Sequence, residues 1–254
     1  MSRIEVNGIS IFYAGRVIPH RPVLLFCHGA GGSHRHWLHQ VEGLQEQAAT
    51  LAVDLPGHGA SEGTAAPEIA VYREFIRDFS AALGLKSLIL AGHSMGGAIA
   101  LDYALHYGES VKGLILVGSG ARLRVAPPFL ELCRAGTVPP ELIDFAYSPA
   151  APAKLLEEAR QEMAAVPPQS YLADFTACNS FDCMEKLSQI RQPVLLLCGE
   201  ADLMTPPRYS RYLKEQLAQA ALIEVKGAGH MAMLEAPQQV NEAIASFLEK
   251  IGSG

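Results

Sequence analysis

Short runs of apolar residues recur along the chain, between longer segments in which apolar residues return every three or four positions. Six runs are continuous, as in strands buried on both faces of a parallel sheet. They begin at Val23, Thr50, Ser87, Gly113, Pro193 and Ala221. Ahead of them, residues 3–13 alternate around Gly8 and predict an antiparallel hairpin. Helical periodicity is expected over residues 36–47, 68–83, 95–106, 207–219 and 237–250. Strands that alternate with helices in this way predict an α/β fold with a mostly parallel sheet.

The alternation is interrupted between residues 121 and 191. This segment carries proline pairs at positions 127–128, 139–140 and 167–168. Because proline is favoured at the start of a helix and disfavoured inside it, we expect several short helices inserted after the sixth strand. An insertion at the carboxyl end of a strand lies over the edge where open α/β sheets bind ligands. The sequence therefore predicts a core of residues 1–120 and 192–254 and a helical lid of residues 121–191.

Composition and charge exclude several classes of protein. The 254 residues are 49% hydrophobic and 18% charged, which suits a globular chain with a sizeable core. A net charge of -6 argues against a nucleic-acid partner, and no apolar run approaches the ~20 residues of a membrane span. The first residues lack the apolar centre of a signal peptide, so we expect a cytoplasmic protein. We also expect it to be a monomer or a homodimer. The five cysteines form no C-x-x-C pair, and no Cys/His set has zinc spacing, so no metal is expected.

The stretch G-H-S-M-G, residues 92–96, fits the pattern G-x-S-x-G between a predicted strand and a predicted helix. The two glycines leave space for a sharp turn that lifts the hydroxyl of Ser94 into a cleft. The amide of Met95 would stand at the helix N-terminus, where an unpaired N–H can stabilise an oxyanion. We therefore predict that Ser94 is a nucleophile and Met95 an oxyanion-hole donor.

A serine hydroxyl needs a base to remove its proton. His230 lies in a glycine-flanked loop after the last strand and is the best candidate. The acid that orients it is expected to be Asp202, after the strand that starts at Pro193, with Glu200 as the alternative. The order serine, acid, histidine is the one that accompanies this elbow motif.

The second oxyanion donor is expected in the glycine-rich loop of residues 28–33, H-G-A-G-G-S. We assign it to the amide of Ala30, with Gly29 or Gly31 as alternatives. Substrate contacts are expected from Gly29 and His93 beside the nucleophile, and from aromatic side chains of the insertion. Those aromatic candidates are Phe145, Phe175 and Phe181.

Five motifs together make the chain resemble the α/β-hydrolase superfamily, in its lidded branch of esterases, C–C hydrolases and haloperoxidase-like enzymes. They are the loop of residues 28–33 with Trp37 beyond it, D-L-P-G-H-G-A-S at 54–61, G-H-S-M-G-G at 92–97, G-E-A-D at 199–202 and G-A-G-H at 227–230. The resemblance covers residues 4–118 and 193–250. It implies an α/β-hydrolase fold and two-step acyl transfer on a small molecule, with no cofactor and no metal. Asp54 lies in a loop that resembles a structural turn of the superfamily, so it is not assigned to catalysis.

The resemblance leaves the substrate open. A small or medium carboxylic ester, or a lactone, is the first hypothesis. C–C hydrolases of dienoate diketo acids usually carry asparagine before the nucleophile, where this chain has His93. Perhydrolase and hydroxynitrile-lyase-like activities are further alternatives, and a ligand receptor on the same fold is the non-enzymatic one.

Overall fold

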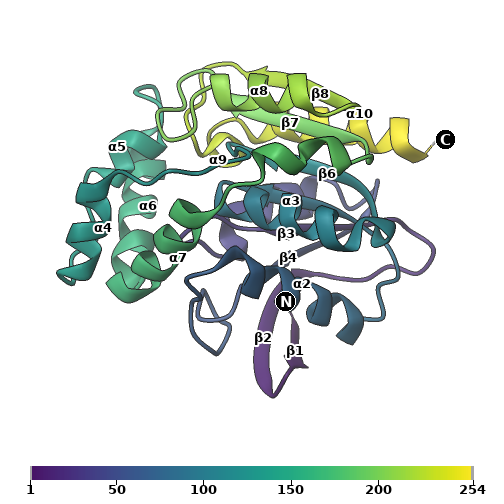
Figure 1. The fold of residues 1–254 in the computed structure, drawn as a ribbon, viewed down its shortest axis with the longest axis horizontal. Helices are drawn as coiled ribbons and strands as arrows, with labels where there is room; N and C mark the ends of the chain where they lie inside the picture. Colours follow the sequence, from purple (N-terminus) through teal and green to yellow (C-terminus); the bar gives the residue numbers. More distant parts are fainter. Residues whose placement is uncertain (1, 253–254) are drawn as a thin grey trace.

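A computed structural model describes residues 2–252 of the chain (Figure 1). Its centre is an eight-stranded sheet in the order β1-β2-β4-β3-β5-β6-β7-β8. The strands are β1 (Ser2–Val6), β2 (Ile9–Gly15), β3 (Val23–Cys27), β4 (Ala49–Val53), β5 (Leu88–His93), β6 (Val111–Val117), β7 (Val194–Gly199) and β8 (Ala220–Val225). From β4 to β8 all neighbours are parallel, while β2 pairs with β1 and β4 in the antiparallel sense. The predicted α/β class and the predicted hairpin are confirmed.

The hairpin is closed by a two-residue turn. Asn7 and Gly8 have φ values of 50° and 80°. Positive φ at both central residues is the type I′ geometry, whose twist matches that of the flanking strands, and Asn-Gly is its preferred sequence.

Helices cover both faces of the sheet. In β3, Leu25 and Cys27 pack into one core cluster while Leu24 and Phe26 pack into the other. The first cluster is closed by α2 (Ile69–Ala82), α3 (Met95–Tyr107) and α8 (Arg208–Gln216), and the second by α1 (Leu38–Gly43) and α10 (Pro237–Gly252). Strands apolar on both faces are therefore buried on both faces, as the continuous runs predict.

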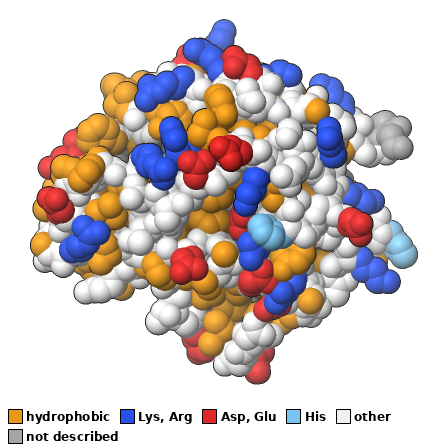
Figure 2. All heavy atoms as spheres, in the orientation of Figure 1, with side chains coloured by type: hydrophobic (Ala, Val, Ile, Leu, Met, Phe, Trp, Pro, Cys, Tyr) orange, Lys and Arg blue, Asp and Glu red, His pale blue; other side chains and the backbone are white. Residues whose placement is uncertain are grey.

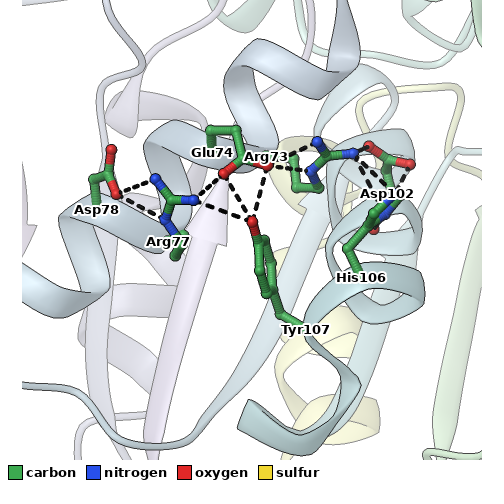
Figure 3. Close-up of polar contacts among 7 residues, drawn as sticks. All are labelled: Arg73, Glu74, Arg77, Asp78, Asp102, His106 and Tyr107. Carbon is green, nitrogen blue, oxygen red and sulfur yellow. Dashed lines mark hydrogen bonds and ion pairs between the residues drawn. The ribbon is translucent and has the colours of Figure 1, made fainter.

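Polar contacts also join α2 to α3 (Figure 3). The Arg73 guanidinium lies 2.9 Å from the Asp102 carboxylate and 2.7 Å from that of Glu74, and the Tyr107 hydroxyl donates to Glu74 at 2.7 Å. This network fixes how α2 and α3 pack beside one another, and α3 begins directly after Ser94.

The chain between β6 and β7, residues 118–193, forms a separate group of helices, here called the insertion. Its elements are α4 (Pro127–Arg134), α5 (Leu142–Ala146), α6 (Ala153–Ala165), α7 (Pro168–Ser180) and the 3₁₀ helix η3 (Met184–Gln189). All five fall inside the segment 121–191, and α4 and α7 begin at the predicted proline pairs. Figure 1 shows α4 to α7 gathered at one side of the sheet, where they enclose a small apolar core of their own.

Two predicted helices are shorter in the structure. In place of a helix over residues 36–47 there is a 3₁₀ helix, η1 (His34–Trp37), followed by α1 (Leu38–Gly43). The chain leaves helical geometry at Leu44 because it must enter β4 at Ala49. The helix expected to end at 219 ends at Gln216, since Leu217 is already extended on the way into β8.

The face drawn in Figure 2 carries charges of both signs together with hydrophobic side chains. On the face drawn in Figure 2, basic and acidic side chains are interspersed rather than separated by sign. Within residues 2–252, no helix is both long and apolar enough to cross a membrane. The five cysteines are free thiols, and all five are buried.

Candidate active site

The turn between β5 and α3 holds Ser94 in an unusual backbone conformation. Its φ is 51° and its ψ is -113°, which is costly for a residue with a side chain. A Cβ on Gly92 would lie 2.0 Å from the Gly96 carbonyl oxygen, and one on Gly96 would lie 2.3 Å from that of Cys27. The turn is therefore tight enough to require glycine at both positions. Ser94 itself lies on the wall of a cavity.

His230 and Asp202 are hydrogen-bonded and buried. His230 Nδ1 lies 2.9 Å from Asp202 Oδ2, and the two residues are 3% and 2% exposed. Burial alone would raise the pKa of the Asp202 carboxyl, but the charge and hydrogen bond of His230, with bonds from Thr205, hold it below its usual range. Asp202 is thus a carboxylate, and it accepts a hydrogen bond from His230 Nδ1–H. This leaves His230 Nε2 free for the cavity, whose wall includes both His230 and Ser94.

Glu200, the alternative acid, is placed differently. It is exposed, and its carboxylate accepts a long 3.4 Å hydrogen bond from the Gly227 amide. Asp202 instead receives the amides of Met204 and Thr205 at 2.9 and 2.8 Å. The geometry therefore favours Asp202 as the partner of His230.

The loop of residues 28–33 lies directly against Ser94. A Cβ on Gly29 would stand 3.2 Å from the Ser94 Cβ and 2.7 Å from His93 Nδ1. Ala30 lies on the cavity wall beside Ser94. The amide of Met95 belongs to the first turn of α3, where N–H groups have no partner inside the helix. The two residues predicted as oxyanion donors thus lie in the segments that adjoin Ser94, since Met95 follows it directly and Ala30 follows Gly29.

His93 packs against His230. Its Nε2 lies 3.1 Å from the His230 carbonyl oxygen and its ring centroid 4.6 Å from that of His230. Burial, followed by repulsion from His230 and His36, lowers its pKa well below the usual range. His93 is therefore neutral, and its Nε2–H donates to the His230 carbonyl. It also lines the cavity, and its predicted contact with substrate stays a prediction.

The cavity has a volume of about 150 Å³ and lies between the core and the insertion. The insertion contributes mainly apolar walls from α5, α6 and α7. The insertion residues that line the cavity include Leu142, Ile143, Met163, Tyr171, Phe175 and Cys178.

Of the three phenylalanines predicted at the pocket, the structure brings Phe175 to the cavity. Phe145 is 41% exposed and packs against the ring of Phe129, 5.7 Å away, outside the cavity lining. Phe181 is buried in the main core cluster and does not line the cavity either. Both lie close in sequence to lining residues, so aromatic character alone did not indicate which side chains face inward.

Sequence reasoning also missed Asp174, a fully buried carboxylate of α7, and His36, a histidine of the cavity wall. Burial lowers the pKa of His36 to about 4. Asp174 stands between Ala173 and Phe175 in an otherwise apolar turn, which was the one available sign that it points inward. Among residues 2–252, no group of three or more His, Cys, Asp or Glu side chains is arranged to hold a metal ion.

The Asp54 loop is a structural turn, in agreement with its treatment in the sequence. The Asp54 carboxylate accepts from the His34 and Ala60 amides at 2.5 and 2.8 Å, and from the His34 ring at 2.9 Å. Asp54 is 0% exposed, and it is absent from the cavity lining. It fixes the start of η1 and the loop after β4.

Comparisons with known proteins agree with this arrangement. RutD of Caulobacter vibrioides, named a putative carbamate hydrolase, is 28% identical over an alignment of 266 positions that covers 96% of each chain. The 3-oxoadipate enol-lactonase 1 of Acinetobacter baylyi is 25% identical over 240 residues, 91% of this chain and 90% of its own. A thermophilic esterase from Thermogutta terrifontis, solved with malate bound, superposes with a TM-score of 0.89, at 25% identity and 99% coverage of both chains. Residues 24–243 match the family model described as the alpha/beta hydrolase family. The chain therefore belongs to the alpha/beta hydrolase family, and hydrolysis is its class of activity.

Proposed function

We propose that the protein is a serine hydrolase that cleaves a small carboxylic ester or a lactone through an acyl-enzyme. The observation that carries the proposal is the strained turn at Ser94. Ser94 shares a cavity wall with His230, whose Nδ1 is hydrogen-bonded to Asp202. A strained, cavity-facing serine beside a buried histidine–carboxylate pair is the arrangement that activates a hydroxyl.

In the proposed reaction, His230 Nε2 takes the proton from Ser94 Oγ as the oxygen attacks the ester carbonyl. The amides of Met95 and Ala30 stabilise the oxyanion, and Asp202 stabilises the imidazolium. The alcohol leaves with the proton from His230. A water molecule, deprotonated by His230, then attacks the acyl-enzyme and releases the acid.

The insertion supports the choice of a small, largely apolar substrate. We propose that residues 121–191 act as a lid, because α5, α6 and α7 supply apolar walls to a cavity of about 150 Å³ above Ser94. The names of the relatives, an esterase and an enol-lactonase, agree with an ester or lactone as substrate.

The test is the Ser94→Ala variant assayed with p-nitrophenyl butyrate and labelled with a fluorophosphonate probe. We expect the variant to lose hydrolysis by at least about a thousandfold and to lose the label. The matched control is Ser210→Ala, a buried serine of α8 outside the cavity, which should keep both. Wild-type hydrolysis by Ser94→Ala would contradict the proposal.

A further inference from the structure

Asp174 is a fully buried carboxylate that the proposed reaction does not use. It lies on insertion helix α7 (Figure 1) and is 0% exposed. Three elements of the core donate to it. The Gly31 amide and His58 Nε2 each lie 2.8 Å from Oδ2, and the Tyr72 hydroxyl donates to Oδ1 at 2.6 Å. A single side chain of the insertion therefore contacts the loop after β3, the loop after β4 and α2.

The hydrogen bonds of His58 are those of a cationic ring paired with a carboxylate. Its Nδ1 lies 3.1 Å from the Pro56 carbonyl oxygen, and its Nε2 faces the Asp174 carboxylate. A carbonyl oxygen and an ionised carboxylate can only accept, so with Asp174 ionised both ring nitrogens carry protons and the ring is cationic. Neighbouring His28 differs, because its Nε2 accepts from the Leu55 amide at 3.1 Å and it is neutral. A cation and an anion, both shielded from water, thus join the insertion to the core.

The Gly31 contact links this pair to the proposed oxyanion hole. Gly31 has a φ of 63°, and a Cβ there would lie 2.2 Å from the Tyr171 ring, so α7 packs directly on the loop. The turn is closed by the Gly32 amide, which donates to the Gly29 carbonyl oxygen at 3.0 Å. That same oxygen accepts from the His28 ring at 2.8 Å.

The direction of the Ala30 amide follows from that turn. In a trans peptide the C=O and N–H point in opposite directions. The Gly29 carbonyl is held by Gly32 and His28, so the Ala30 N–H of the same peptide plane points the other way. Asp174 fixes the next plane, through the Gly31 amide. The orientation of the oxyanion donor thus depends on a carboxylate of the insertion.

We propose that Asp174 is a positioning residue, which uses its ion pair with His58 and its hydrogen bond to Gly31 to hold the Ala30 amide in the oxyanion hole. This inference rests on the proposed serine-hydrolase function and extends it. It makes the insertion part of the catalytic geometry in addition to a wall of the pocket. An intact α7 is then required for transition-state stabilisation, even for substrates too short to contact the lid.

The experiment compares Asp174→Asn with the wild type on p-nitrophenyl butyrate. Rates are expressed per active site, counted by complete fluorophosphonate labelling. We expect kcat to fall about tenfold to a hundredfold with KM within about twofold, since a displaced oxyanion donor weakens transition-state binding. The inhibition constant of a trifluoromethyl ketone, whose adduct carries an oxyanion, should rise by about the same factor.

The control is Tyr72→Phe, which removes a donor from the opposite oxygen, Oδ1, and leaves the Gly31 and His58 contacts in place. It should lower the melting temperature while kcat per active site stays within about twofold of the wild type. If Asp174→Asn does not fold, the double variant His58→Gln/Asp174→Asn removes both charges together and leaves neither unpaired. It is then measured in the same way, with the same expected losses.

Wild-type kcat per active site in Asp174→Asn, or in the double variant, would overturn the inference. So would a loss of kcat without the matching loss of ketone affinity, which indicates a purely structural role. A wild-type protein that is neither labelled at Ser94 nor active on esters overturns the proposed function, and this inference with it. An active, labelled wild type with an equally active Asp174→Asn overturns the inference alone.

Discussion

Burial and hydrogen bonding separate two carboxylates that stand two residues apart. Asp202 is buried and accepts from two backbone amides as well as from His230, whereas Glu200 is exposed. A carboxylate held in this way keeps the imidazole in one tautomer and stabilises its positive charge. Glu200 has no contact through which it could do either.

We therefore expect Asp202→Asn to reduce kcat by about a thousandfold with little change in KM, because the asparagine favours the wrong tautomer of His230. Glu200→Gln is the matched control and should retain kcat within about twofold. Steady-state kinetics on p-nitrophenyl butyrate decide between them. A larger loss in Glu200→Gln would assign the acid to Glu200.

Some residues of the site could be predicted from the sequence and others could not. The turn at Ser94 was predictable because its geometry demands glycine at positions 92 and 96, which leaves a local pattern. Asp174 left only one local sign, a lone carboxylate in an otherwise apolar turn, because its three donors come from residues more than a hundred positions away. Its role depends on long-range packing, which a local pattern does not encode.

Helix α7 serves both the pocket and the core. Phe175 is 5% exposed and lines the cavity, and Tyr171 of the same helix covers Gly31. By contrast α6 has no fully buried residue, although Met163 and Glu162 reach the cavity. The proline pairs in the sequence predict where α4 and α7 begin. Which face of such a short helix points inward is decided by packing against the core. That is why Phe175 and Phe145 could not be told apart in advance.

We expect Phe175→Ala to shift the preferred acyl length of p-nitrophenyl esters upward, since removing the ring enlarges the cavity. Pocket contacts discriminate by about 1–3 kcal/mol per methylene, so the shift should appear as roughly a tenfold or larger change in relative kcat/KM. Phe145→Ala, on an exposed ring of α5, is the control and should leave the profile unchanged. An unchanged profile in both variants would show that α7 does not shape the acyl site.

The fold as a whole encloses several charges whose ionisation is linked to stability. Asp54 and Asp202 are buried carboxylates whose pKa values are lowered by their hydrogen bonds and by nearby histidines. Their contribution is present above the pKa of an unfolded aspartate and is lost as the pH falls. The contribution of the His58–Asp174 pair to stability is lost in the opposite direction, as the pH rises. Acid and mild alkali should therefore weaken different parts of the molecule.

Burial would lower the pKa of His58, but the hydrogen bond and charge of Asp174 outweigh it and raise the pKa above its usual range. The groups that face His58 are Asp174, Asp54, His28 and Tyr72. When the pH lies between the pKa of His58 in the unfolded chain and its higher pKa in the folded protein, the folded protein keeps a proton that the unfolded chain has released. Stability from His58 is therefore complete below about pH 6.5 and falls as the pH rises.

The decisive measurement is the free energy of unfolding in urea from pH 5.5 to 8.5, for the wild type and for His58→Gln/Asp174→Asn. The contributions of Asp54 and Asp202 are common to both proteins and cancel in the difference. We expect the difference to be constant below about pH 6.5 and to move against the wild type as the pH rises, because only the wild type retains the His58 proton on folding. A difference that is independent of pH, or that moves in favour of the wild type, would mean that His58 is not held as a cation.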